Sequence, residues 1–287
     1  MNSNSLFVVF IHWRLLKKKL VTENQSFFKI SETVQQKPEN FRLFDLFFRL
    51  LSTLDDLTLL QLITILMDHI VKIISTEYIT HDVKHFVVAR PAGFEFVPGH
   101  ATDLSINKEG WEDNKHPFTF TGLVGAPDLE FVIKIYPNPQ GVTHHLSWLG
   151  PGDELIISDP WGAIEYKGPG YFIAGGAGIT PFIAILRDLQ KNGKVAGNIL
   201  FFSNKTDKDI ILKEELESML GKNAHFTITR QKDSQYDQRK INSDFLKAEV
   251  KDFSQHFYVC GPDEMVIEIS KILEELGAKP DSVVFEK

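Results

Sequence analysis

The stretch from Gly170 to Gln190 constrains the fold more than any other part of this 287-residue sequence. It begins with Tyr171–Ala174, a short apolar run that fits a strand buried on both faces. Three glycines follow at Gly175, Gly176 and Gly178. Because glycine has no side chain, the backbone of this turn can adopt positive φ and approach a ligand closely.

The glycine turn leads into a predicted helix from Phe182 to Gln190, because apolar side chains recur there on one face. Thr180 suits the N-cap, and Pro181 suits the first helical position. Unpaired N–H groups and the positive end of the helix dipole would then face the turn, which favours a dinucleotide pyrophosphate. The spacing Gly176-x-Gly178-x-x-Pro181 lacks the third glycine of the full dinucleotide pattern, so a plain tight connection stays open from this motif alone.

Strands and helices alternate throughout residues 169–287, which predicts a five-stranded parallel, doubly wound nucleotide-binding domain. The expected strands are Tyr171–Ala174, Asn198–Ser203, Ala224–Thr229, His256–Cys260 and Ser282–Phe285, and the later helices are Ile210–Leu220, Ser243–Ala248 and Asp263–Leu276. Ligands of such sheets bind at the carboxyl ends of the strands. Gly175, Ser203 and Cys260 fall at such ends.

Residues 67–168 have a different pattern of short apolar or alternating runs separated by Gly, Pro, Asn and Asp. The expected strands are His69–Glu77, Val83–Ala89, Ala101–Ile106, Phe118–Leu123, Leu129–Ile135 and Glu154–Ser158. Six short strands with little helix predict an antiparallel Greek-key barrel, so the fold class is a β barrel followed by an α/β domain. Gly141–Leu149, a glycine followed by one or two helical turns, is a second place where backbone N–H groups could face a phosphate.

Residues 1–66 form an N-terminal extension that is unlike the rest of the chain. The run Leu57–Met67 is uncharged but too short to span a bilayer, so no transmembrane segment is expected. One interpretation is an amphipathic helix over residues 41–66 that makes peripheral contact with a membrane or another protein. The interpretation we favour is an extension outside the catalytic module.

Composition excludes several classes of function. The chain has 31 Lys+Arg and 38 Asp+Glu, of which the first 66 residues hold 8 and 6, so residues 67–287 carry a charge of −9. This acidic body argues against nucleic-acid binding. A single cysteine excludes an internal disulfide, a structural zinc cluster and a cysteine-ligated iron–sulfur centre, and a reducing cytoplasm fits it. No metal is expected, because the neighbouring His144 and His145 would not face one ligand on a helix.

Four short motifs occur in order along residues 69–287. They are His116-Pro117-Phe118-Thr119, Gly141-Val142-Thr143, Gly175-Gly176-x-Gly178-x-Thr180-Pro181 and Cys260-Gly261-Pro262-x-x-Met265. Together they resemble the ferredoxin–NADP reductase family of flavoenzymes, whose corresponding motifs are Arg-x-Tyr-Ser, Gly-x-x-Ser/Thr or Gly-x-Ser, Gly-Gly-x-Gly-x-Thr-Pro and Cys-Gly-Pro-x-x-Met. Residues 1–68 lie outside the resemblance.

The resemblance implies that FAD binds in the barrel. Phe118 would stack on the isoalloxazine and Thr119 would form a hydrogen bond with flavin N5, while the segment Gly141–Thr143 would cradle the pyrophosphate. His116 replaces an arginine that holds a flavin phosphate in the family. Histidine is mostly neutral near pH 7 and has no guanidinium fork, so we expect flavin binding to be weaker or to depend on pH.

The resemblance also implies that NADPH or NADH binds at the third and fourth motifs, with Cys260 near nicotinamide C4. Thr119 and Cys260 are then the two expected catalytic positions. Ser203 and Lys205 could meet the 2′-phosphate of NADPH, but the sequence leaves the choice between the two nucleotides open. Phe285 would shield the flavin or only pack the last strand.

The expected function is hydride transfer from NAD(P)H to FAD, followed by transfer of single electrons to a separate acceptor. Flavodoxin, ferredoxin, an oxygenase component or a small molecule could be that acceptor, although a module of charge −9 would not attract the acidic ferredoxins and flavodoxins. We expect a monomer. Two alternatives remain, namely an NAD(P)H:flavin reductase that uses diffusible flavin and a non-catalytic adaptor that retains the fold.

Overall fold

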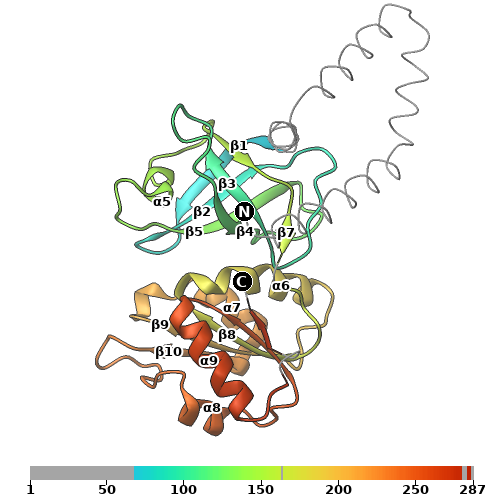
Figure 1. Ribbon diagram of the computed structural model, residues 1–287, viewed down its shortest axis with the longest axis vertical. Helices are drawn as coiled ribbons and strands as arrows, with labels where there is room; N and C mark the ends of the chain where they lie inside the picture. The colour runs from blue at the N-terminus through green and yellow to red at the C-terminus, as the bar shows by residue number, and fades with distance from the viewer. Residues whose placement is uncertain (1–67, 163, 280–282, 286–287) are drawn as a thin grey trace, which may run out of the picture. The chain divides into compact units, whose positions relative to one another are not determined.

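The computed structural model describes residues 68–162, 164–279 and 283–285, the last three by their backbone alone (Figure 1). Met67–Lys287 form one compact unit that holds both the barrel and the α/β part. The expectations for residues 1–66, including contacts through 41–66, fall outside the described residues. Within the described part of the chain, no helix is both long and apolar enough to cross a lipid bilayer.

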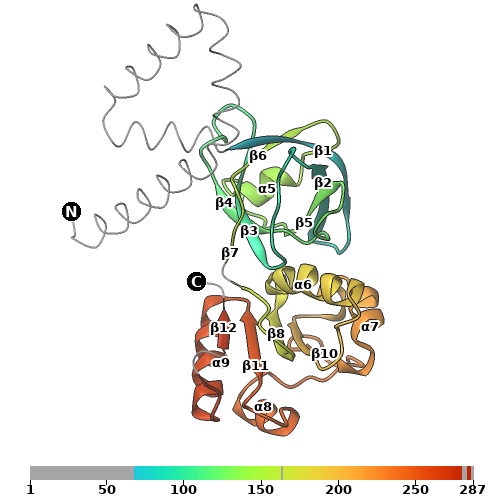
Figure 2. The ribbon, with the colours of Figure 1, turned by 90° about the vertical axis from the view of Figure 1, so that its right-hand side faces the viewer.

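The first half of this unit is an antiparallel barrel, as predicted (Figure 2). Its strands are β1 (His69–Tyr78), β2 (Val83–Ala89), β3 (His100–Ile106), β4 (His116–Thr119), β5 (Asp128–Lys134) and β6 (Glu154–Ile157), and the short helix α5 (Val142–Leu146) lies between β5 and β6. The strand order is β4-β3-β6-β1-β2-β5, and a bridge between Phe120 and Phe131 joins the two edges. The sequence pattern did not predict β7 (Trp161–Gly162), a two-residue strand that pairs with β3.

Strand β4 begins two residues earlier and ends four residues earlier than the predicted Phe118–Leu123. The chain leaves β3 after Thr119 and crosses to β5, where the Thr121 N–H donates to the Glu130 carbonyl oxygen at 2.9 Å. Phe120 enters the barrel core, where its ring lies 5.1 Å from that of Phe131. Closing the barrel therefore ends the strand.

The second half is a five-stranded parallel sheet in the order β10-β9-β8-β11-β12, which confirms the predicted α/β architecture. Its strands are β8 (Gly170–Gly175), β9 (Ile199–Asn204), β10 (Ala224–Ile228), β11 (His256–Cys260) and β12 (Val283–Phe285). Its helices are α6 (Thr180–Lys191), α7 (Lys213–Leu220), α8 (Ser243–Glu249) and α9 (Asp263–Glu275), with 3₁₀ turns η1 (Gly176–Ile179), η2 (Asp207–Asp209) and η3 (Gly221–Asn223).

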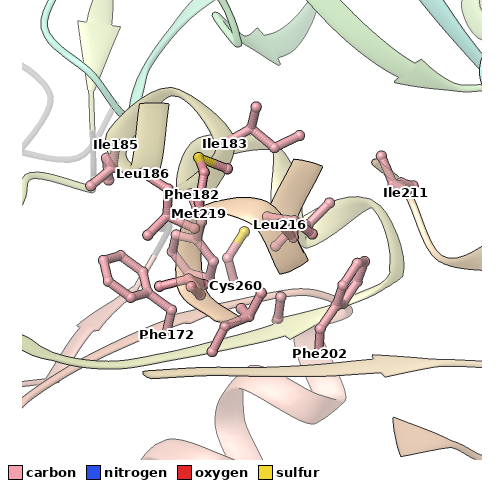
Figure 3. Packing of buried hydrophobic residues seen from close by; sticks show 14 of the residues in the cluster. Phe172, Phe182, Ile183, Ile185, Leu186, Phe202, Ile211, Leu216, Met219 and Cys260 are labelled. Carbon is pink, nitrogen blue, oxygen red and sulfur yellow. The ribbon is translucent and has the colours of Figure 1, made fainter. Parts of the chain in front are cut away.

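The alternation of side chains along β8 separates two apolar cores, one on each face of the sheet. Phe172 packs with residues of α6 and α7, including Phe182 at a ring distance of 5.1 Å (Figure 3). Tyr171 and Ile173 pack instead with residues of α8 and α9. Helices therefore cover both faces, and the carboxyl ends of the strands stay open for a site.

Helix α7 begins at Lys213, three residues later than the predicted Ile210. Leu212 adopts a left-handed conformation, with φ of 51° and ψ of 39°, which a helix cannot contain. Ile210 and Ile211 are buried in the core beneath α6 and α7. These two apolar residues are thus buried in a loop. The sequence pattern alone could not distinguish a buried loop from the first turn of a helix.

The buried hydroxyl of Tyr258 fixes the segment that enters the α/β sheet. It accepts hydrogen bonds from the N–H groups of Lys167 and Gly168, at 2.9 and 3.0 Å, and donates to the Gly168 carbonyl at 2.8 Å.

Tyr258→Phe leaves these backbone groups without their partner, so we expect the free energy of unfolding to fall by about 1–3 kcal/mol. Urea denaturation measures this loss, and Tyr78→Phe, at a ring that is 52% exposed, should change it by less than about 0.5 kcal/mol.

Candidate nucleotide and flavin site

A cavity of about 540 Å³ opens at the carboxyl ends of β8, β9 and β11. Ten residues singled out from the sequence line it, namely Gly175, Gly176, Gly178, Thr180, Ser203, Lys205, Cys260, Gly261, Pro262 and Met265. The structure therefore brings the third and fourth motifs together with the end of β9. Pro181 lies behind the cavity wall, buried in α6.

The three glycines of the turn serve two different purposes. Gly176 alone has a left-handed φ, of 53°, so its backbone requires glycine. A Cβ on Gly178 would lie 2.3 Å from the carbonyl oxygen of Cys260, and one on Gly175 would lie 2.5 Å from Sδ of Met265. Gly178 is thus needed to seat the turn against the Cys260 backbone, whereas a side chain at Gly175 would require the Met265 side chain to move. The sequence analysis did not assign this packing role.

Thr180 is not the N-cap of α6, which corrects the sequence prediction. The turn η1 precedes the helix, so Ile179 becomes the N-cap, Thr180 the first helical residue and Pro181 the second. The Thr180 hydroxyl donates to the Ala177 carbonyl at 3.0 Å and so closes η1. The first turn of α6 contains no acidic residue, and the helix dipole still favours an anion in the cavity.

Cys260 belongs both to the cavity wall and to the core beneath it. Its side chain is 4% exposed and packs in the cluster that α6 and α7 cover (Figure 3). The backbone of Cys260 and Gly261 meets Gly178 at the cavity floor. The residue can therefore fix the depth of the cavity, whereas its buried thiol is a soft apolar contact.

Two cationic residues that border the cavity lie side by side at the ends of β9 and β10. The Arg230 N–H donates to the Lys205 carbonyl oxygen at 2.9 Å, and both side chains are exposed. Beside them, Asn204 is 4% exposed, and its Oδ1 accepts no hydrogen bond within the described residues. A ligand with a hydrogen-bond donor could pair with Asn204 Oδ1, and negative charge on the ligand would attract Lys205 and Arg230.

Lys134 and Tyr136, which the sequence analysis missed, line the cavity from the barrel side. Lys134 Nζ lies 2.7 Å from Asp82 and 3.9 Å from Asp209. These two carboxylates and His81 are close enough to surround a cation, and the ammonium group already fills that role. No local spacing marks Lys134 or Tyr136, because their neighbours in the cavity come from the other half of the unit.

The first of the four motifs, His116–Thr119, lies on β4 and outside this cavity. His116 and Pro117 are exposed, and His116 Nε2 lies 3.0 Å from Asn114 Oδ1. Phe118 is half-buried against the barrel core, and Thr119 is 8% exposed. An aromatic side chain and a hydroxyl therefore occupy successive positions at the end of β4.

The second motif, Gly141–Thr143, lies at the start of α5. Gly141 is its N-cap, Val142 is buried in the barrel core, and Thr143 accepts a hydrogen bond from the Tyr136 N–H at 3.2 Å. This bond connects the motif to a residue of the cavity wall. The His145 ring lies against the Trp111 ring at a tilt of 34°, with the ring centroids 3.7 Å apart.

Lys84 secures the opposite end of α5. Its ammonium donates to the carbonyl oxygens of Ser147 and Leu149, at 2.9 and 2.7 Å, just beyond the helix. Burial lowers the pKa of Lys84, while Asp153 acts in the opposite direction. A buried cation at the carboxyl end of α5 also suits the helix dipole, so Lys84 holds the second motif in place.

The prediction for Phe285, in the last strand, concerns a side chain that lies outside the described residues. The backbone of Phe285 pairs with Val259 in β12 and β11, but its ring is not described. Whether the ring shields a flavin stays a prediction.

The contact between Gly178 and Cys260 can be tested directly. In Gly178→Ala the new methyl group meets a backbone carbonyl, so we expect a loss of about 1–3 kcal/mol in the free energy of unfolding and weaker nucleotide binding. Urea denaturation and nucleotide titration measure the two effects. Gly150→Ala is the control, because a Cβ there has no neighbour within 4 Å. Equal stability of the two variants would contradict the assignment.

Comparison with known proteins agrees with this architecture. Residues 172–271 match the model of the family described as "Oxidoreductase NAD-binding domain". The reductase component of propane 2-monooxygenase from Rhodococcus jostii is 26% identical over 227 residues, which are 74% of this chain and 61% of that protein. NADH–cytochrome b5 reductase 1 of Arabidopsis thaliana is 33% identical over 161 residues, 52% of this chain and 56% of that protein. The chain spans less than two thirds of the length of these relatives.

Solved structures show the same fold over both halves of the unit. A ferredoxin NADP⁺ reductase from Neisseria gonorrhoeae, with bound FAD and NADP, superposes with a TM-score of 0.66 at 19% identity, over 77% of this chain and 98% of that one. The flavohaem-like FAD/NAD-binding domain of a nitric oxide dioxygenase from Vibrio cholerae gives 0.67 at 20% identity, over 76% and 97%. The chain therefore shares the fold of these solved structures, a barrel followed by a parallel sheet, and residues 172–271 of that fold match an oxidoreductase NAD-binding domain.

Proposed function

We propose that this chain is a flavoprotein reductase that moves electrons from NAD(P)H through FAD to a separate acceptor. The observation that carries the proposal is the cavity at the strand ends, whose floor is the contact between Gly178 and Cys260 and whose far wall comes from the barrel. When they are bound, NAD(P)H supplies a hydride and FAD accepts it and releases electrons singly. The residues of the chain bind, orient and shield these groups.

The nicotinamide nucleotide would bind at the start of α6. The positive end of the α6 dipole and the left-handed turn at Gly176 favour the pyrophosphate, and no acidic side chain in the first turn of α6 opposes it. Gly261, Pro262 and Met265 form the wall beside the turn. Cys260 would set how deeply the nicotinamide ring enters, which makes it a positioning contact.

The flavin would bind along the barrel, with its reactive ring at the end of β4. Phe118 offers its face for stacking, and the hydroxyl of Thr119 can form a hydrogen bond with a ring nitrogen. Gly141 and Thr143 would contact the pyrophosphate, on the helix that Lys84 anchors. Alignment of two rings at contact distance is the main catalytic contribution expected of such a site.

The 2′-phosphate of NADPH would meet Ser203, Lys205 and Arg230, which share one side of the cavity. A ribose hydroxyl of NADH would fit the same wall through Asn204. Both nucleotides are therefore candidates, and their relative affinities decide the physiological donor.

The acceptor that we propose is a protein such as an oxygenase component. Three relatives are named as reductase or electron-transfer components of propane 2-monooxygenase, naphthalene 1,2-dioxygenase and toluate 1,2-dioxygenase systems. The single cysteine of this chain cannot hold a four-cysteine iron–sulfur cluster, so an acceptor that contains such a cluster would supply the ligands itself.

An anaerobic titration of the purified protein tests the proposed function. We expect bound flavin absorbance, and we expect it to bleach on addition of NADH or NADPH, with the lower dissociation constant identifying the donor. A colourless protein that oxidises NAD(P)H only when flavin is added would support the diffusible-flavin alternative. A flavin-binding protein that neither nucleotide reduces would support a non-catalytic adaptor.

His116→Arg tests the flavin motif. Arginine is always charged and can fork onto a phosphate, so we expect the FAD dissociation constant to fall by about tenfold or more. Quenching of flavin fluorescence measures the constant in both proteins. A matched substitution at His81, an exposed histidine on the turn between β1 and β2, should leave it unchanged. An unaltered constant in His116→Arg would show that this side chain does not reach a flavin phosphate.

A further inference from the structure

One arginine of α6 connects the nucleotide-binding half of the unit to the barrel. Arg187 Nη1 donates to the Thr121 carbonyl at 2.8 Å and to Glu130 at 3.1 Å, and both partners belong to the barrel. Its Nε and Nη2 form a two-point contact with Glu215 of α7, at 2.5 and 2.8 Å. The side chain is only 18% exposed, so these bonds hold it in one geometry.

The charges around this guanidinium form a continuous network. A hydrogen bond from His85 of β2 is the main cause of the lowered pKa of Glu130; burial opposes it and Arg187 adds to it. Burial lowers the pKa of Arg187, but its pairs with Glu215 and Glu130 outweigh burial and raise it. Arg187 and Glu130 are therefore both charged near neutral pH, and their contact is an ion pair.

The position of Arg187 relates two sites that otherwise belong to separate halves. Thr121 is two residues beyond Thr119, the residue expected at flavin N5. In the other direction, Arg187 lies seven residues after Thr180 on one helix, a rise of about 10 Å. A single side chain thus links α6 to the segment that follows β4, and α6 and β4 are the elements that would carry the two reacting rings.

We propose that Arg187 is a positioning residue for hydride transfer, which holds the nicotinamide site of α6 at reacting distance from the flavin site of β4. The inference rests on the proposed function. Reacting atoms must lie about 3–3.5 Å apart, and an error of about 1 Å can lower a rate about 100-fold. Each cofactor would bind mainly to groups of its own half, so loosening the link should alter the rate more than either affinity.

A stabilising role alone would give a different result. A buried ion pair is weak support for stability, because the cost of desolvation offsets much of the attraction. If Arg187 served stability alone, its loss would lower the unfolding transition, while folded molecules would keep their rate of flavin reduction. The rate measured on folded, flavin-loaded protein therefore separates the two roles.

The test compares the wild type with Arg187→Met in anaerobic stopped-flow reduction by the better nucleotide. We expect the limiting rate of flavin bleaching to fall at least about tenfold, while the flavin content and the nucleotide dissociation constant stay within about threefold. Arg187→Lys retains the positive charge but cannot make the two-point contact of the guanidinium, so it should recover part of the limiting rate of flavin bleaching.

Arg239→Met is the matched control. Arg239 also pairs with two carboxylates, Asp237 and Glu249, and lies 4.9 Å from the Phe245 ring, but all these partners belong to the α/β half. We expect its limiting rate to stay within about twofold of the wild type. An equal fall in both variants would assign the effect to general loss of ion pairing and overturn the proposal.

Two further outcomes are decisive. A limiting rate in Arg187→Met within twofold of the wild type overturns the proposal. If that variant does not fold or loses its flavin, Glu130→Gln, which keeps the shape and removes the charge, takes its place, and an unchanged rate there also overturns it. Failure of the proposed function is distinct, because then neither nucleotide bleaches the flavin of the wild type.

Discussion

The contact between the glycine turn and the end of β11 is the steric constraint on which the candidate site depends. The hydrogen of Gly178 faces the Cys260 carbonyl in a space that cannot hold a methyl group. This approach brings the turn after β8 against the segment after β11, two neighbours in the sheet that are far apart in the sequence. The cavity floor, the start of α6 and the position of Cys260 all follow from it.

Electrostatics adds a second constraint, because three largely buried cations of this acidic unit lie where separate elements meet. Lys84 holds the end of α5, and Lys134 joins the barrel to Asp209 beside the cavity. Arg187 links α6 and α7 to the barrel. These residues lie where two elements meet, whereas Lys205 and Arg230 are exposed at the cavity and remain accessible to an anionic ligand.

Local patterns in the sequence were enough to predict the fold class. Period-two alternation and short strands predicted the barrel, and the alternation of strands with helices predicted the parallel sheet. The errors came where tertiary contacts replaced local preference. Thr180 has the chemistry of an N-cap, but η1 moved the start of the helix by one residue. The pattern at Ile210 and Ile211 is helical, yet both residues are buried in a loop before a left-handed Leu212.

The sequence by itself determined the order of the two halves, the four motifs and the strand ends at which a nucleotide could bind. Only the tertiary structure decided which of these groups share one cavity, because Lys134 and Tyr136 reach it from the other half of the unit. It also decided why Gly178 must be glycine, and it revealed Arg187 as a link between α6 and the barrel. The physical reason is the same in each case: these contacts join residues distant in sequence, and neither hydrophobic period nor motif spacing records such distances.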